Sequence, residues 1–90
     1  MAFQKDPDAV LDYMVDWTRW LGTDTIATSD WIVPTGITET TATATTTTAT
    51  IWLSGGTPGV SYSIVNRIIT SAGRADDRTI VVECRSGLSQ

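Results

Sequence analysis

Residues 38–50 read TETTATATTTTAT, and nine of these residues are threonine. Threonine is branched at Cβ, which favours a strand and disfavours a helix. A disordered, sugar-decorated linker usually combines Ser and Thr with proline, but neither proline nor glycine occurs between Thr38 and Ser54. The run also continues directly into the apolar Ile51-Trp52-Leu53. The stretch therefore predicts folded β structure rather than a linker that divides the chain.

The two halves of this stretch differ in how well they define a strand. Residues 38–45 fit either a further strand or an extended loop, and any disorder would be confined to about 38–44. For about residues 46–54 we predict an ordered strand, because two sets of side chains alternate along it as on the two faces of a strand. Thr48, Thr50, Trp52 and Ser54 form one set, and Ala49, Ile51 and Leu53 form the other.

Alternation with a period of two recurs elsewhere and predicts further strands. Residues 10–17 place Leu11, Tyr13, Val15 and Trp17 on one face, and residues 25–33 follow with a bulge expected near Ser29-Asp30. Residues 60–71 and 78–85 predict two more strands, joined by residues 72–77 as a hairpin loop. No helical segment is expected. Six or seven short strands separated by turns predict an antiparallel β-sandwich.

The chain length fits one domain. Ninety residues is a single-domain size, so we expect one immunoglobulin-like domain over residues 1–90, with 1–7 and 86–90 as flexible ends. The N-terminus lacks the charged-then-apolar order of a signal peptide. No apolar run approaches the 18 residues that a membrane-spanning helix needs. We therefore expect synthesis and folding in a cytoplasm, with no membrane as a partner.

The composition excludes several kinds of site. The formal net charge is −4 with one lysine and scattered arginines, which argues against nucleic acid as a partner. The chain has no histidine and one cysteine, so an internal disulfide and the usual Cys/His zinc sites are excluded. Cys84 falls on the apolar phase of its strand, which favours a buried, inert thiol over a nucleophile. No cofactor is expected.

The acidic residues do not define a catalytic or metal site. Asp12 and Asp16 share a strand face but lie roughly 13 Å apart, which is too far for a glycosidase pair. We expect them on a solvated face, with an interface role as the alternative. Asp76-Asp77 with Asp24 or Asp30 could offer oxygens to calcium, but the Asp-x-Asp-x-Asp-Gly spacing is missing. The sequence therefore predicts neither an enzyme nor a metal protein.

A strand, a Pro-Gly turn and a tyrosine follow one another in residues 51–64. Tyr62 comes three residues after Gly59, which resembles the tyrosine corner of immunoglobulin-like domains. In that corner the tyrosine hydroxyl hydrogen-bonds to backbone a few residues upstream. We expect Gly59 and Tyr62 to form such a structural corner. The alternative is an ordinary half-buried aromatic residue on a strand.

The four tryptophans are the largest side chains available for a core or an interface. Each buried indole N–H needs an acceptor, and a sandwich of this size has little room for four. We expect Trp17 and one of Trp31 and Trp52 in the core. Trp20, beside a turn, and Trp52, on the threonine face of its strand, are the candidate interface residues, since tryptophan is enriched in interface hot spots.

Three strings extend from Asp6 to Glu83: DPDAVLDYMVDWTRWLGTDTI, TATIWLSGGTPGVSYSIVNRIITSAGR and DDRTIVVE. With them the chain resembles a family of tailed-bacteriophage fiber–tail adaptors, which are small immunoglobulin-like virion structural proteins. The most specific pieces are Asp16-Trp17 with Trp20-Leu21, Asp24-Thr25-Ile26, the segment from Trp52 to Gly56, Gly59 with Tyr62, and Gly73-Arg74.

The resemblance implies a protein present in several copies on the virion, at the tail or neck, where it links a fiber to the tail body. Its implied partners are other tail, neck and fiber proteins, and it would be made in the host cytoplasm. The free edges of a sandwich suit such docking, and copies in a virion are arranged by symmetry. The alternatives are a capsid decoration or cement protein and, less favoured, a carbohydrate-binding module with a row of exposed aromatic rings.

Overall fold

The computed structural model describes residues 2–6 and 8–85. Over these residues the chain forms strands and one short helix. In chain order they are β1 Ala2–Lys5, β2 Leu11–Asp16, α1 Thr18–Leu21, β3 Ile26–Ile32, β4 Ile37–Ala44, β5 Thr48–Gly55, β6 Ser61–Thr70 and β7 Ala75–Cys84.

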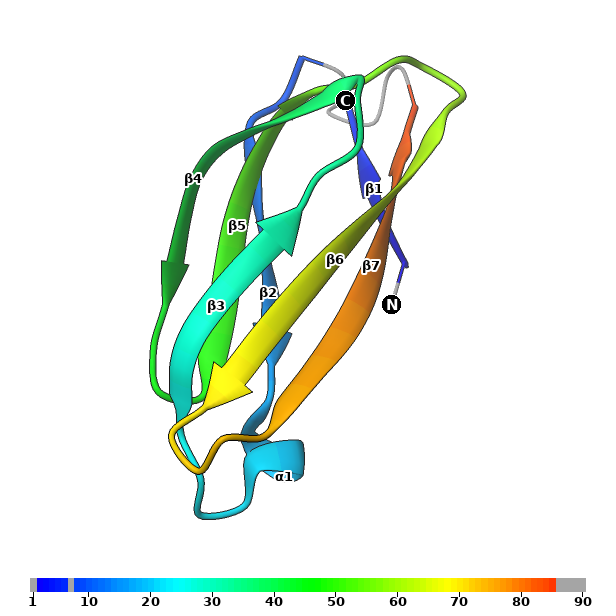
Figure 1. The fold of residues 1–90 in the computed structure, drawn as a ribbon. Helices are drawn as coiled ribbons and strands as arrows, with labels where there is room; N and C mark the ends of the chain where they lie inside the picture. Colours follow the sequence, from blue (N-terminus) through cyan, green and yellow to red (C-terminus); the bar gives the residue numbers. More distant parts are fainter. Residues whose placement is uncertain (1, 7, 86–90) are drawn as a thin grey trace.

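The strands form two sheets that pack face to face (Figure 1). One has the order β1-β7-β6-β3, and the other has the order β2-β5-β4. With β2 to β7 taken as strands B to G, these are the B-E-D and C-F-G sheets of an immunoglobulin-like sandwich. The predicted fold class is confirmed. One pairing departs from the antiparallel prediction, because β1 runs parallel to β7.

The core lies between the sheets and follows the alternation of the sequence. In β6 every second side chain is buried along the whole strand, and in β7 the same alternation holds in the C-terminal half, as the period-two pattern predicts. Cys84 is among them and is fully buried. The buried cluster consists of Tyr13, Val15, Trp17, Leu21, Ile37, Ile51, Leu53, Tyr62, Ile64, Ile68, Ile80, Val82 and Cys84.

The N-terminal segment is a strand where we expected a flexible end. Phe3 packs against the core, with its ring centroid 5.0 Å from that of Tyr13. Lys5 is fully buried, and its Nζ donates a hydrogen bond to the carbonyl oxygen of Gly55 at 2.7 Å. These contacts anchor β1 to β2 and β5, and its parallel pairing places it beside β7, so the prediction is wrong for Ala2–Lys5. The rest of the expected ends, residues 1, 7 and 86–90, lies outside the described residues.

A single helical turn, α1, interrupts the predicted all-strand chain. The side chain of Asp16 accepts a hydrogen bond from the backbone N–H of Thr18 at 2.9 Å, which turns the chain away from β2. The turn carries Leu21 into the core. The prediction of no helix is therefore wrong. Four residues are too few to show a helical period.

The threonine-rich stretch forms a hairpin. Residues 37–44 are β4, which resolves the alternatives for this half in favour of a strand. The second strand, β5, begins at Thr48, two residues later than predicted, and ends at Gly55. The turn forms at Thr45, whose hydroxyl accepts hydrogen bonds from the N–H groups of Thr47 and Thr48 at 3.2 and 3.0 Å. Here the side chain competes with strand pairing for the backbone.

Two other boundaries also differ from the prediction. The irregularity in β3 lies between Ile26 and Thr28 rather than at Ser29-Asp30. From Ser29 onward the side chains of Ser29, Trp31 and Val33 all point inward, so the alternation is already regular there. The β6–β7 loop is shorter than the predicted residues 72–77, since β7 begins at Ala75.

Candidate docking surfaces

Trp17 is a core residue with all of its polar needs met. It is fully buried, and its Nε1 donates a hydrogen bond to Oδ1 of Asn66 at 2.9 Å. Asn66 is also fully buried, and its Nδ2 donates to Ser29 Oγ and to the Asp30 carbonyl oxygen, both at 3.0 Å. The guanidinium of Arg78 lies 4.3 Å from the Trp17 ring centroid. This network leaves Trp17 no part in docking.

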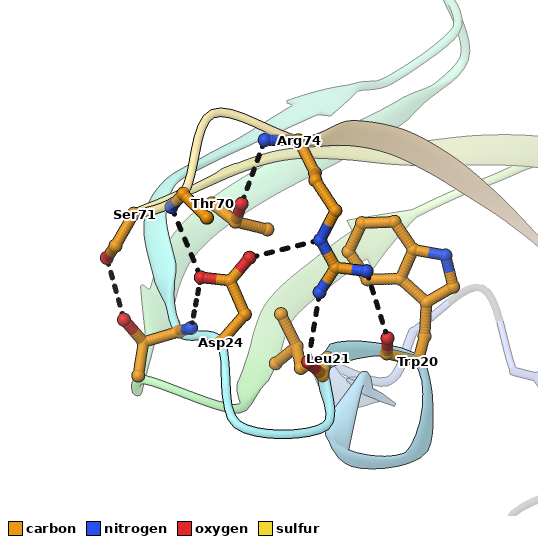
Figure 2. Close-up of polar contacts among 8 residues, drawn as sticks. Trp20, Leu21, Asp24, Thr70, Ser71 and Arg74 are labelled. Atoms are coloured by element: carbon orange, nitrogen blue, oxygen red, sulfur yellow. Dashed lines mark hydrogen bonds and ion pairs between the residues drawn. The ribbon is translucent and has the colours of Figure 1, made fainter.

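Trp20 belongs to a second internal cluster, which Figure 2 shows. Its ring meets that of Trp17 edge-on, with centroids 5.3 Å apart. The guanidinium of Arg74 lies 4.3 Å from the Trp20 ring centroid and donates hydrogen bonds to the carbonyl oxygens of Leu21 and Trp20 at 2.9 and 3.4 Å. These contacts tie α1 to the β6–β7 hairpin. Trp20 is only partly exposed, and its interface role stays a prediction.

Asp24 completes this cluster, which we call the α1 clasp (Trp20, Leu21, Asp24 and Arg74). Its Oδ2 accepts a hydrogen bond from Nε of Arg74 at 3.1 Å. Its Oδ1 accepts from the N–H groups of Thr25 and Ala72 at 2.8 and 3.2 Å. The pKa of Asp24 is lowered from 3.8 to about 2, and the largest cause is a hydrogen bond from the Thr70 side chain. The hydrogen bonds from Thr25, Arg74 and Ala72 lower the pKa further, and together these bonds outweigh burial, which raises it. The carboxylate is therefore ionised at neutral pH, and both of its oxygens accept hydrogen bonds from within the chain.

Gly59 and Tyr62 lie where β5 crosses to β6. The backbone N–H of Val60 bonds to the Thr57 carbonyl oxygen at 3.1 Å, and Gly59 has the positive φ of 84° that the third position of a type II turn requires. Tyr62 is buried, and its hydroxyl accepts a hydrogen bond from the N–H of Thr57 at 2.9 Å. This geometry supports the proposal that Gly59 and Tyr62 form a tyrosine corner.

The glycine beside this turn is a close-packing position. Gly56 has a φ of 102°, and a Cβ added there would lie 2.2 Å from Sγ of Cys84. A side chain at this position would have to displace the buried Cys84 thiol and adopt a positive φ, so Gly56 tolerates little change.

The outer face of the β2-β5-β4 sheet carries the most exposed aromatic residue among the described residues. Trp52 lies on the central strand β5 with 37% of its surface exposed, between Asp12 of β2 and Thr41 of β4. Met14 is 51% exposed on the same face. A tryptophan and a methionine on an otherwise polar, threonine-rich sheet are suited to contact a partner. We name Trp52, Met14, Thr41 and Thr50 the Trp52 face.

The edge strands β3 and β4 lie on the same side of the sandwich (Figure 1), and a cleft of about 120 Å³ lies between them. Ser29, Trp31, Ala42, Thr43 and Ala44 line this cleft. Nε1 of Trp31 is buried without a hydrogen-bond partner among the described residues. Burying a hydrogen-bond donor without an acceptor costs roughly 1–3 kcal/mol of folding free energy. The isolated chain therefore leaves one buried donor without an acceptor on this side, among the described residues. Sequence reasoning placed no site there.

The described residues hold no group of three or more His, Cys, Asp or Glu side chains placed to bind a metal ion. Asp76 and Asp77, which we weighed as calcium ligands, are exposed, and Asp77 pairs with Arg67 at 2.8 Å. Within the same part of the chain no helix is long and apolar enough to cross a membrane.

An immunoglobulin-like sandwich with an exposed tryptophan and with edge strands open to pairing has the features that a structural docking module needs. A family model described as podophage GP4 fiber-tail adaptor protein gp77 matches residues 5–83. The chain belongs to this family, and the match confirms the resemblance seen in the sequence. It is thus a virion structural protein that serves as an adaptor for tail fibers. A search of curated proteins gave no match.

Proposed function

We propose that the protein is a non-enzymatic adaptor, present in several copies, that holds a tail fiber to the tail or neck of the virion. It is made in the host cytoplasm and reaches the tail during assembly, and its partners are proteins. Membership of the fiber-tail adaptor family supports this. The net charge of −4 also argues against nucleic acid as a partner.

The Trp52 face is the surface that we assign to docking. Among the described aromatic side chains Trp52 is the most exposed. Trp17 is committed to the core, and Trp20 to the α1 clasp. A large ring in a flat sheet face offers apolar area that a partner can bury, while Asp12 and the threonines around it form a polar rim. Trp52 is therefore favoured over Trp20 as the central contact.

Two other functions are less well supported. A capsid decoration protein needs the same sandwich, and the family match favours the tail instead. A carbohydrate-binding module needs several exposed rings in a row. Trp20 and Trp31 are only partly exposed, and neither belongs to β5 beside Trp52.

Binding to the fiber protein of the same phage tests the proposal. The purified chain is titrated against that fiber protein, and against the tail or neck protein in a second arm, by calorimetry. Trp52→Ala should weaken one of these interactions at least tenfold, since hot-spot residues contribute about 2 kcal/mol or more. Ile69→Ala is the matched control, because Ile69 is an exposed apolar residue on the other sheet.

Two results would contradict the proposal. Equal binding by Trp52→Ala and Ile69→Ala would remove the Trp52 face from docking. A virion reconstruction that placed the chain on the capsid lattice would remove the adaptor function itself.

A further inference from the structure

The two sheets leave four edge strands among the described residues, β1 and β3 in one sheet and β2 and β4 in the other. An edge strand presents unpaired N–H and C=O groups to which another strand can bind. Proteins usually protect such edges with lysine, proline, inward charges or bulges, or keep them very short. The edges of this chain differ in how far they are protected.

The β4 edge is the least protected. It is eight residues long, and each of them except Ile37 is exposed. Its irregularity lies near Glu39 and Thr41, so residues 41–44 pair regularly with β5. Glu39 is its only charged residue, and residues 38–54 contain no lysine, arginine or proline. Ala42 and Ala44 lie opposite the buried Ile51 and Ala49 of β5 and belong to the same inward-facing set, yet both alanines are exposed to solvent.

Charge distinguishes β4 from the other edges as a place for self-association. An antiparallel pair of β2 strands centred on Met14 would set Asp12 of each copy opposite Asp16 of the other, and like charges directly opposite are destabilising. On β3 the acidic residue, Asp30, lies in the middle of the regularly paired residues 28–32, whereas Glu39 of β4 lies outside the regularly paired residues 41–44. The β1 strand has only four residues. In an antiparallel pair of β4 strands centred on Ala42, Thr41 faces Thr43 of the second copy and Ala42 faces its equivalent. Glu39 lies opposite the neutral Thr45 of the second copy.

We propose that two copies of the chain bind to each other through antiparallel pairing of β4, about a two-fold axis at Ala42. The β2-β5-β4 sheets of the two copies then form one continuous sheet. Threonine pairs with threonine on the outer face, which is a favourable cross-strand pair. Alanine meets alanine on the inner face, where small side chains let the strands approach closely. The same patch on both copies makes the contact, so the assembly closes as a dimer.

The open cleft fits the same partner. It lies between β3 and β4, and Ala42, Thr43 and Ala44 form one of its walls. A second copy bound along β4 covers the mouth of the cleft on the β4 side. Trp31, whose Nε1 has no partner among the described residues of one chain, also lines this cleft. The cleft is thus part of the dimer contact.

The first test measures the mass of the purified chain by light scattering and analytical ultracentrifugation. The wild-type chain should show twice the 9.7 kDa of one chain and dissociate on dilution. Ala42→Lys puts a charge at the two-fold axis and should weaken the dimer at least tenfold. Met14→Lys, an exposed substitution on the other edge of the same sheet, is the matched control and should leave the dimer unchanged. Unchanged far-ultraviolet circular dichroism shows that each variant is folded.

Two results of this experiment would overturn the proposal. One is a wild-type chain whose measured mass remains 9.7 kDa at protein concentrations up to about 1 mM, because a dimer that does not form there has a Kd weaker than about 1 mM. The other is an assembly larger than a dimer that Met14→Lys also disrupts, because that pattern indicates head-to-tail pairing of β4 with β2.

Disulfide trapping tests the geometry. Directly opposite residues in an antiparallel pair have Cα atoms about 4.5–5.5 Å apart, within the range for a disulfide. Ala42→Cys should therefore give a covalent dimer on mild oxidation. The wild-type chain controls for Cys84, which is fully buried. A covalent dimer formed as readily by Thr28→Cys, on the β3 edge, would contradict pairing through β4.

This inference rests on the several copies of the adaptor proposed above, but its failure is distinguishable from failure of that function. Ala42→Lys should lose the dimer and still bind the fiber or tail protein. Trp52→Ala should keep the dimer and lose that binding. If Ala42→Lys keeps the dimer, the β4 contact is wrong and the adaptor function stands.

Discussion

The α1 clasp and the β4 edge use polar side chains in opposite ways. In the clasp, one arginine and one aspartate meet two backbone carbonyl oxygens, two backbone N–H groups and an indole ring. At the β4 edge, the threonines from Thr38 to Thr43 are exposed, and a nearby indole N–H has no partner among the described residues. The polar groups of the clasp find their hydrogen-bond partners within the chain, whereas those of the β4 edge are open to the second copy that we propose.

This difference indicates how function is divided along the molecule. The clasp fixes the turn between β2 and β3 against the β6–β7 hairpin, so it sets the shape of one end of the sandwich (Figure 2). The β4 edge contributes little to the core, since Ile37 is its only buried residue. Substitutions in the clasp should therefore affect stability, and substitutions at the edge should affect association.

The largest effect is expected for Trp17, which connects the clasp to the core. Trp17→Ala should reduce the free energy of unfolding by about 3–5 kcal/mol, because it leaves a cavity and removes the donor to Asn66. Urea denaturation followed by circular dichroism measures this. Trp52→Ala is the control and should cost about 1 kcal/mol. Equal losses would mean that the two tryptophans do not differ in role.

Arg74→Ala should have the next largest effect. It removes the cation–π contact with Trp20 and the hydrogen bonds to the carbonyl oxygens of α1, at a cost of about 1–2 kcal/mol. Arg74→Lys should restore only part of this, since an ammonium group lacks the planar fork. The control is Arg67→Ala, which breaks an exposed ion pair with Asp77 and should cost less. A larger loss for Arg67→Ala would show that the clasp is not the stronger contact.

Acid should weaken the clasp. The pKa of Asp24 is lowered to about 2 in the folded chain from an ordinary value of 3.8. A carboxylate with a lowered folded-state pKa stabilises the fold above its unfolded pKa, and this contribution disappears as the pH falls from about 4 through 2. Melting temperatures measured between pH 2 and 6 should therefore fall less steeply for Asp24→Asn than for the wild-type chain. Asp16 and Asp77, whose pKa values are also lowered, contribute to the slope in both chains. Parallel curves would exclude Asp24 as a source of acid sensitivity.

The smallest effect on stability is expected at the β4 edge. Thr43→Ala should change the free energy of unfolding of the monomer by less than about 0.5 kcal/mol, because the side chain is exposed. The denaturation is run at low protein concentration, where association does not contribute. A loss of 1 kcal/mol or more would show that the edge helps to hold the monomer together.

Strands with one buried face could be predicted from the sequence. Alternation placed Ala49, Ile51 and Leu53 on one face of their strand, and the structure buries all three. The β4 strand was ambiguous because both of its faces are exposed, so its residues carry no apolar alternation. The start of β5 was missed because hydrogen bonds to the Thr45 hydroxyl, rather than hydrophobicity, set the turn.

Contacts between distant residues could not be predicted in the same way. Arg74 was noticed as part of a family-specific pair, but its contact with Trp20 joins residues 54 positions apart. The β1 strand was missed because it contains Lys5, which is fully buried although local pattern rules assign lysine to solvent. Trp31 Nε1 is buried without a hydrogen-bond partner among the described residues. This depends on how β3 and β4 are placed around the cleft, which the alternation of residues along a strand does not reveal.

The parallel pairing of β1 with β7 has a mechanical consequence for a protein that carries a fiber. Ala2 lies beside Val81, and Lys5 lies beside Cys84. A force that pulls β1 toward its N-terminal end and β7 toward its C-terminal end therefore slides the two strands along each other. The hydrogen bonds between them share that tension and must break together, whereas strands pulled apart from one end open one bond at a time. The described domain thus resists tension between its two ends in shear.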